Sequence, residues 1–172
     1  MKITLKKIKY SKYASQETNN FVADLYVDGK PFAIVCNDGV GGCDMHHKHE
    51  KNPQSHAQFH EELSRIDKWH KENTTYKTEY DDRGFSEGDL DIKVSELLEN
   101  YLLEKEVKRL MSSNMIIFEK GTRGFYKYGK KKYKVTLNSM GAFRAKIAKW
   151  HKQTVCINDM PLEQAIAYFK AN

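Results

Sequence analysis

The sequence predicts an α+β fold in which antiparallel hairpins, one N-terminal and one C-terminal, pack with about four helices. Three observations support this class: short strand-like stretches gather near both ends, tight-turn dipeptides join them, and amphipathic helical stretches occupy separate blocks. With 172 residues, 40% hydrophobic and 12% aromatic, the chain is long enough to bury a core. We therefore expect a single domain over residues 1–172.

The first hairpin has the clearest turn pattern. Residues 21–27 and 31–36 are strand-like and flank Asp28-Gly29, a dipeptide preferred in the type I′ turn of a two-residue loop. An uninterrupted two-residue hairpin pairs Leu25 with Phe32. We expect both side chains to face the core.

The preceding strand and the following helix have local signals of their own. Residues 2–10 alternate as a strand, and the break in alternation at Lys6-Lys7 predicts a β-bulge. Residues 37–54 are rich in glycine and histidine and predict a loop. Ser55-His56-Ala57-Gln58 matches a capping box, which predicts a helix ending near His70.

Charge divides the chain unevenly. Residues 1–100 carry 14 basic and 18 acidic side chains, whereas residues 101–172 carry 15 basic and 5 acidic ones. Within the first of these stretches, the polar and acidic segment 73–90 predicts a linker or mobile loop. It marks a possible soft boundary between a front half, 1–72, and a basic back half, 91–172.

The back half repeats the same kinds of pattern. Apolar spacing predicts helices, and alternating stretches joined at Gly129-Lys130 predict a second hairpin. The expected elements are a helix over 93–112, strands over 115–119, 123–128, 131–137 and 154–157, a helix after Ser139 and a last helix from Pro161.

The second hairpin is the leading candidate for a binding surface. Its outer face would place four cations around one exposed aromatic ring: Arg123, Phe125, Lys127, Lys132 and Lys134. Cations bind phosphates and an exposed ring stacks on an unpaired base, so the face suits nucleic acid. Arg144 and Lys149 of the next helix would extend it. An acidic protein surface would satisfy the same cations, and a lysine-protected edge with Phe125 packed on a neighbour is the structural alternative.

The glycine-rich loop is a second candidate. Glycines after a strand permit the positive φ angles that an anion-binding nest requires. The residues concerned are Asn37, Asp38, Gly39, Gly41 and Gly42. The loop lacks the Lys-Ser/Thr of a P-loop, and a tight irregular turn is the alternative interpretation.

Cysteine and histidine residues suggest a zinc site. His56 and His60 are spaced i, i+4 on one helix, and Cys43 and His46 lie upstream, so these four residues are conceivable zinc ligands. No other cofactor is expected. The acid pairs Asp81-Asp82 and Asp89/Asp91 are interpreted as solvated loop charges.

The opening segment carries a resemblance. Lys-x-x-Lys-Tyr-Ser-Lys-Tyr-Ala-Ser-Gln-Glu-Thr-Asn-Asn-Phe, followed by Val-Asp-Gly and Asn-Asp-Gly-x-Gly-Gly, resembles the N-terminal region of small uncharacterised proteins encoded by tailed phages. It covers roughly the first 45 residues. The resemblance implies no activity, cofactor or catalytic residue. It implies a phage accessory protein in the bacterial cytoplasm that acts on nucleic acid or against a host defence system.

Other properties narrow the function class. The sequence contains no stretch of 18 apolar residues, so we expect no membrane span. Three scattered cysteines favour a reducing cytoplasm. We expect a non-enzymatic protein that binds nucleic acid or an acidic, nucleic-acid-processing host protein. The alternatives are a metal-dependent enzyme acting on a nucleotide or phosphodiester through segment 43–60, and a protein–protein inhibitor of a host enzyme.

Overall fold

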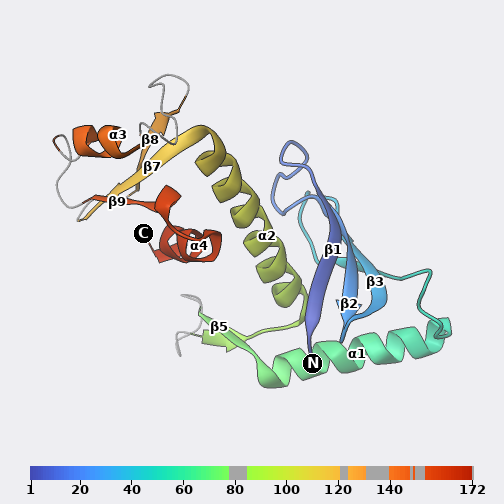
Figure 1. Ribbon diagram of the computed structural model, residues 1–172. Helices are drawn as coiled ribbons and strands as arrows, with labels where there is room; N and C mark the ends of the chain where they lie inside the picture. The colour runs from blue at the N-terminus through green and yellow to red at the C-terminus, as the bar shows by residue number, and fades with distance from the viewer. Residues whose placement is uncertain (78–84, 121–123, 131–139, 148, 150–153, 172) are drawn as a thin grey trace. The chain divides into compact units, whose positions relative to one another are not determined.

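The computed structural model describes residues 1–77, 85–120, 124–130, 140–147, 149 and 154–171 (Figure 1). The chain forms two compact units, Met1–Glu99 and Asn100–Asn172. Four helices and antiparallel sheets of four and three strands confirm the α+β class. The expected strand over 131–137 and the expected helix cap Ser139 lie outside the described residues.

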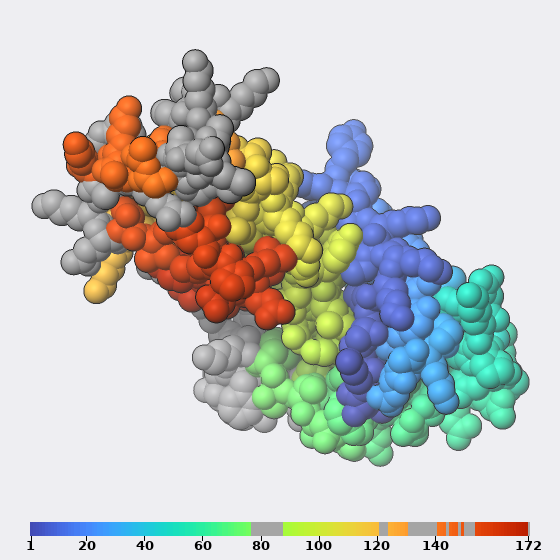
Figure 2. Space-filling model, in the orientation of Figure 1, coloured from blue at the N-terminus to red at the C-terminus, as the bar shows by residue number. Residues whose placement is uncertain are grey.

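The N-terminal unit is built on a four-stranded antiparallel sheet with the order β1-β2-β3-β4. Its strands are β1 (Ile3–Tyr10), β2 (Phe21–Val27), β3 (Lys30–Asn37) and β4 (Met45–Lys48). The outer surface of β1 and β2 is visible in Figure 2 (blue). The expectation that 37–54 is all loop is wrong, because β4 lies inside it and pairs with β3 from Ala33 to Cys36. This pairing satisfies backbone groups that β3 would otherwise leave open at an edge.

Both local backbone predictions for the first strands are confirmed. Asp28 and Gly29 adopt φ angles of 47° and 82°, as a type I′ turn requires. The β1–β2 register shifts between Lys6 and Lys9, and Lys7 has a φ of 51°. The bulge brings the Lys7 ammonium within 2.8 Å of the Asp24 carboxylate.

The predicted pairing of Leu25 with Phe32 is wrong by one residue. Leu25 lies opposite Ala33, because the β2–β3 register shifts between Leu25 and Tyr26. Pro31 lacks the N–H that a regular ladder needs at this point. The extra residue allows Phe32 and Ala33, although adjacent in sequence, both to be buried.

Helix α1 (His56–Asn73) begins at the predicted capping box. The Ser55 hydroxyl accepts from the Gln58 amide and the Gln58 side chain accepts from the Ser55 amide. Phe59 is buried, and its ring centroid lies 5.1 Å from that of Phe32. Short paired strands, β5 (Thr75–Lys77) and β6 (Phe85–Glu87), occupy part of the segment expected to be a loop.

Helix α2 (Leu90–Ser113) begins three residues earlier than predicted. The C-terminal unit contains a three-stranded antiparallel sheet in the order β8-β7-β9. Its elements are β7 (Asn114–Glu119), β8 (Tyr126–Gly129), α3 (Met140–Ile147), β9 (Thr154–Cys156), the 3-10 helix η1 (Ile157–Asp159) and α4 (Leu162–Ala171).

The central strand β7 is covered on both faces. Ile116 and Phe118 pack with residues of α2, η1 and α4, whereas Met115 and Ile117 pack with α3. All four side chains are therefore buried, which explains their continuous apolar sequence. Helix α4 buries Ala165 in the same core and has an exposed outer surface (Figure 2, red).

Asn158 joins three parts of this unit through its side-chain amide. Its Oδ1 accepts from the Ile116 amide at 2.8 Å. Its Nδ2 donates to the carbonyls of Met111 at 3.1 Å and Asn114 at 2.9 Å. The side chain thus connects η1 to the end of α2 and to β7.

Within the described residues, every helix is too short or too polar to cross a bilayer.

We predict that Asn158→Asp lowers the free energy of unfolding by about 1–3 kcal/mol, since two carbonyls lose their donor and face a carboxylate. Urea denaturation followed by circular dichroism measures the change. Asn100→Asp is the matched control, because Asn100 accepts a hydrogen bond from Lys170 through Oδ1, which an aspartate retains. Equal effects of the two substitutions would contradict the role assigned to Asn158.

Candidate functional site

The predicted exposure of Phe125 is wrong. The ring is half-buried and packs on the core between Phe118, at 5.5 Å, and Phe169, at 4.8 Å between ring centroids. Burial against other aromatic rings stabilises Phe125 more than exposure to water would. Phe125 is therefore not available as a base-stacking surface in this structure.

The cations of the same candidate surface have different placements. Lys127 on β8 and Lys149 after α3 are exposed. Arg144 lies on α3, but its side chain is outside the described part of the chain, as are Arg123, Lys132 and Lys134. Lys130, at the predicted turn, donates to the carbonyl of Met111 at 2.6 Å and so caps the end of α2.

The glycine-rich loop is held by Asn37, which is buried at the end of β3. Its Oδ1 accepts from the Thr18 hydroxyl at 2.6 Å and from the Gly39 amide at 2.9 Å. The amide of Gly41 donates to Thr18 Oγ1 at 3.3 Å, and the Val40 amide donates to Asp38 Oδ1 at 3.2 Å. Three amides that an anion nest would use, those of Gly39, Val40 and Gly41, are thus already bonded, which favours the alternative of a structured turn.

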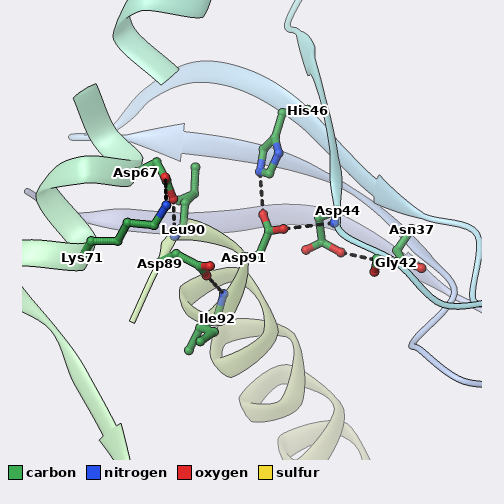
Figure 3. Close-up of polar contacts among 10 residues, drawn as sticks. All are labelled: Asn37, Gly42, Asp44, His46, Asp67, Lys71, Asp89, Leu90, Asp91 and Ile92. Atoms are coloured by element: carbon green, nitrogen blue, oxygen red, sulfur yellow. Dashed lines mark hydrogen bonds and ion pairs between the residues drawn. The ribbon is translucent and has the colours of Figure 1, made fainter. Parts of the chain in front are cut away.

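The strongest polar cluster lies just beyond this loop, around Asp44 (Figure 3). Asn37 Nδ2 donates to Asp44 Oδ1 at 3.0 Å. The Asp44 amide donates to Asp91 Oδ2 at 3.1 Å, and His46 Nε2 lies 3.8 Å from Asp91 Oδ1. The cluster thus joins β3, β4 and the first turn of α2.

Two further carboxylates cap the N-terminus of α2. Asp67 Oδ1 accepts from the Leu90 amide at 3.1 Å, and Asp89 Oδ1 accepts from the Ile92 amide at 2.9 Å. These acids satisfy amides that the helix leaves open, and the positive end of its dipole favours them. Lys71 forms an ion pair with Asp67 at 2.7 Å.

Burial sets the electrostatics of the cluster. It raises the pKa of Asp44 from 3.8 to about 6, against the opposing hydrogen bond from Asn37 and with a further increase from the charge of Asp91. Burial also raises the pKa of Asp91, and it lowers the pKa of His46 despite the nearby Asp91 carboxylate. Near neutral pH, Asp44 is thus mainly ionised and His46 is neutral.

The cluster is accessible through two hollows. Their volumes are about 340 and 360 Å³, and Asp44, Asp89 and Asp91 line both. The first hollow also has apolar walls, and the second includes His46. The site can therefore admit a small ligand that carries positive charge.

The four residues predicted to bind zinc do not lie around one hollow. His46, His56 and His60 line one depression, where the rings of His56 and His60 stack at 5.7 Å, whereas Cys43 is exposed and lines another hollow. Among the described residues, no group of three or more His, Cys, Asp or Glu side chains is arranged to hold a metal ion. Zinc binding stays an untested prediction.

Asp44 and Asp91 were the functional candidates that sequence reasoning missed. Asp91 was interpreted as a loop charge because α2 was expected to begin at residue 93. The sequence does contain a signal for the earlier start, since Asp89 is three residues before Ile92 and serves as an N-cap. No local pattern relates Asp44 to Asp91, which are 47 positions apart.

Comparisons with models of protein families, with curated proteins and with solved structures find no match.

We predict that Gly39→Ala is more destabilising than Gly42→Ala. Both glycines have positive φ angles, 85° and 87°, so each alanine introduces roughly 1–2 kcal/mol of backbone strain. A Cβ at Gly39 would also lie 2.3 Å from the Ala14 carbonyl oxygen, whereas one at Gly42 meets nothing within 4 Å. We expect Gly39→Ala to lower the free energy of unfolding, measured in urea, by roughly 1–3 kcal/mol more than Gly42→Ala does. Equal losses would show that the loop is not tightly packed there.

We predict that Asp44→Asn stabilises the protein near pH 7.5 by about 1–2 kcal/mol, because it removes a half-buried charge. The raised pKa means that ionising Asp44 lowers stability as pH rises from about 4 to 6. The advantage of the variant should therefore disappear near pH 4. Urea unfolding at both pH values measures it, with the exposed Asp38→Asn as control. A variant less stable than the parent near pH 7.5 would contradict this account.

Proposed function

We propose that this chain is a non-enzymatic nucleic-acid-binding protein and that its C-terminal unit supplies the binding surface. The excess of 15 basic over 5 acidic side chains in residues 101–172 supports this proposal. A phosphate backbone is a ligand that such a concentration of lysine and arginine suits, because these side chains neutralise phosphates.

The distribution of ion pairs adds to this support. Part of the acidic charge is already engaged along α2, where Glu104 contacts Lys108 and Glu106 contacts Arg109. In contrast, Lys120, Lys127 and Lys149 are exposed. None of these three lysines forms an ion pair with an acid in the described part of the chain. These three free ammonium groups are the observation on which the proposal depends.

The placement of Phe125 determines the kind of recognition we propose. Because the ring is packed on Phe118 and Phe169, Phe125 does not supply the stacking platform expected from the sequence. Tyr126, 39% exposed beside Lys127, is an aromatic ring on the same strand, and the lysines supply the charge. Charge alone contacts phosphates and does not read bases. We therefore propose binding with little sequence preference and a steep dependence on salt.

The wider setting of this activity is also a proposal. The resemblance of the first 45 or so residues to phage-encoded proteins suggests an accessory or anti-defence role in a bacterial cytoplasm. In that setting, the ligand would be phage or host nucleic acid, or the acidic surface of a protein that processes it.

We predict that Lys127→Glu with Lys149→Glu weakens nucleic-acid binding at least tenfold. Fluorescence anisotropy with labelled single- and double-stranded oligonucleotides, over a range of salt concentrations, gives the affinity. Loss of two phosphate contacts should reduce the slope of log affinity against log salt by about 2 for the duplex.

The charge-matched control is Lys12→Glu with Lys51→Glu, two exposed lysines of the N-terminal unit. This variant should bind as the parent does. Absent or salt-insensitive binding by the parent would overturn the proposal. Binding of poly-glutamate with no binding of either oligonucleotide would assign the surface to an acidic protein instead.

A further inference from the structure

Two buried polar atoms beside Asp91 have no hydrogen-bond partner among the described residues. They are Asp44 Oδ2 and His46 Nε2. The His46 side chain is only 9% exposed, and it lines the second hollow. Buried acceptors are normally paired, and an unpaired one in a native site needs an explanation.

The tautomer of His46 makes this arrangement more unusual. Nε2 has no hydrogen-bond partner in the described part of the chain, and a neutral imidazole carries a proton on only one of its two nitrogens. With that proton on Nδ1, Nε2 is a bare acceptor that points toward Asp91 Oδ1 at 3.8 Å (Figure 3). Two lone pairs then face each other.

Three donors close to the cluster are already engaged elsewhere. Asn37 uses its amide on Asp44 Oδ1, and the Asp44 amide donates to Asp91 Oδ2. Lys71, which lines the same hollow as His46, forms its ion pair with Asp67. These three donors therefore leave Asp44 Oδ2 and His46 Nε2 unpaired.

We propose that this cleft binds the primary ammonium group of an aliphatic amine. An ammonium has three N–H donors, which match the three acceptors Asp44 Oδ2, His46 Nε2 and Asp91 Oδ1. Two carboxylates balance its charge, and a separation of 3.8 Å between two acceptors is one that a single ammonium can span.

The walls of the first hollow suit the aliphatic part of such a ligand. Phe21, Ile92 and Leu98 line it together with Asp44 and Asp91. Apolar contact along the stem and charge at the head is the way lysine side chains and alkylamines are bound. A metal ion fits less well, because the described residues hold no group of three or more ligands arranged for one.

Titration with n-butylammonium chloride, followed by amide NMR shifts of the full chain, tests the proposal. We expect saturable shifts at Asp44, His46 and Asp91. The neutral n-butanol and the tetramethylammonium ion, which has no N–H, should bind at least tenfold more weakly. Asp44→Asn should reduce affinity at least tenfold, whereas Asp38→Asn, on the exposed side of the loop, should leave it unchanged.

Several results would overturn the proposal. Equal binding of n-butanol would show an apolar pocket only, and equal binding of tetramethylammonium would remove the hydrogen-bond argument. Shifts reproduced by sodium chloride would be an ionic-strength effect. Saturable Mn²⁺ binding that Asp44→Asn abolishes, without butylammonium binding, would identify the occupant as a metal ion.

The same titration with a second ligand tests whether the ammonium group comes from a polypeptide or from a free amine. Nα-acetyl-lysine-N-methylamide presents the group as a polypeptide does, and n-butylammonium presents it as a free amine. Tighter binding of the lysine derivative would indicate a lysine of a partner protein. Tighter binding of the alkylamine would indicate a small molecule, and either result supports the proposed chemistry.

Discussion

The hydrogen bonds of Asn37 are the constraint on which the candidate site depends. One buried amide accepts from Thr18 and Gly39 and donates to Gly42 and Asp44. These contacts fix the chain where it leaves β3, turns through the glycines and returns as β4. Without them, the backbone that presents Asp44 to Asp91 would have no defined path.

The carboxylates beyond Asn37 differ in what they contribute to stability. Asp67 and Asp89 accept from open amides at the start of α2, so their charges are stabilised where the helix dipole is positive. Asp44 Oδ2 accepts no hydrogen bond from the described residues, and burial opposes the ionisation of this carboxyl group. A group that is charged near neutral pH at the expense of stability is typical of a binding or reactive site.

Much of the fold could be predicted from local patterns because their physical causes are local. The Asp28-Gly29 turn, the Lys6-Lys7 bulge and the capping box at Ser55 each depend on neighbouring residues. The errors arose where distant residues decide the outcome. The strand β4 pairs with the edge that β3 would otherwise leave open. Phe125 is half-buried because Phe169, which is 44 positions further along the sequence, packs on it.

The same limit explains the candidate site. Composition and spacing drew attention to the glycine loop and to His46. They left an anion-binding nest and a tight turn open for the loop, and offered zinc as one use of the histidine. The orientation of amides and lone pairs, which sequence does not encode locally, favours the turn. The loop's amides bond to side-chain oxygens, and the unpaired atoms nearby are acceptors.

The overall formal charge of +6 is therefore the sum of regions with opposite charge. The cleft of the N-terminal unit gathers Asp44, Asp89 and Asp91 and repels phosphate. The C-terminal unit exposes lysines that attract it. Ligands of opposite sign would not compete for one surface, so loss of either binding activity by mutation should leave the other in place. A polyanion and an alkylammonium ion are thus independent probes of this chain, and the failure of one proposal carries no consequence for the other.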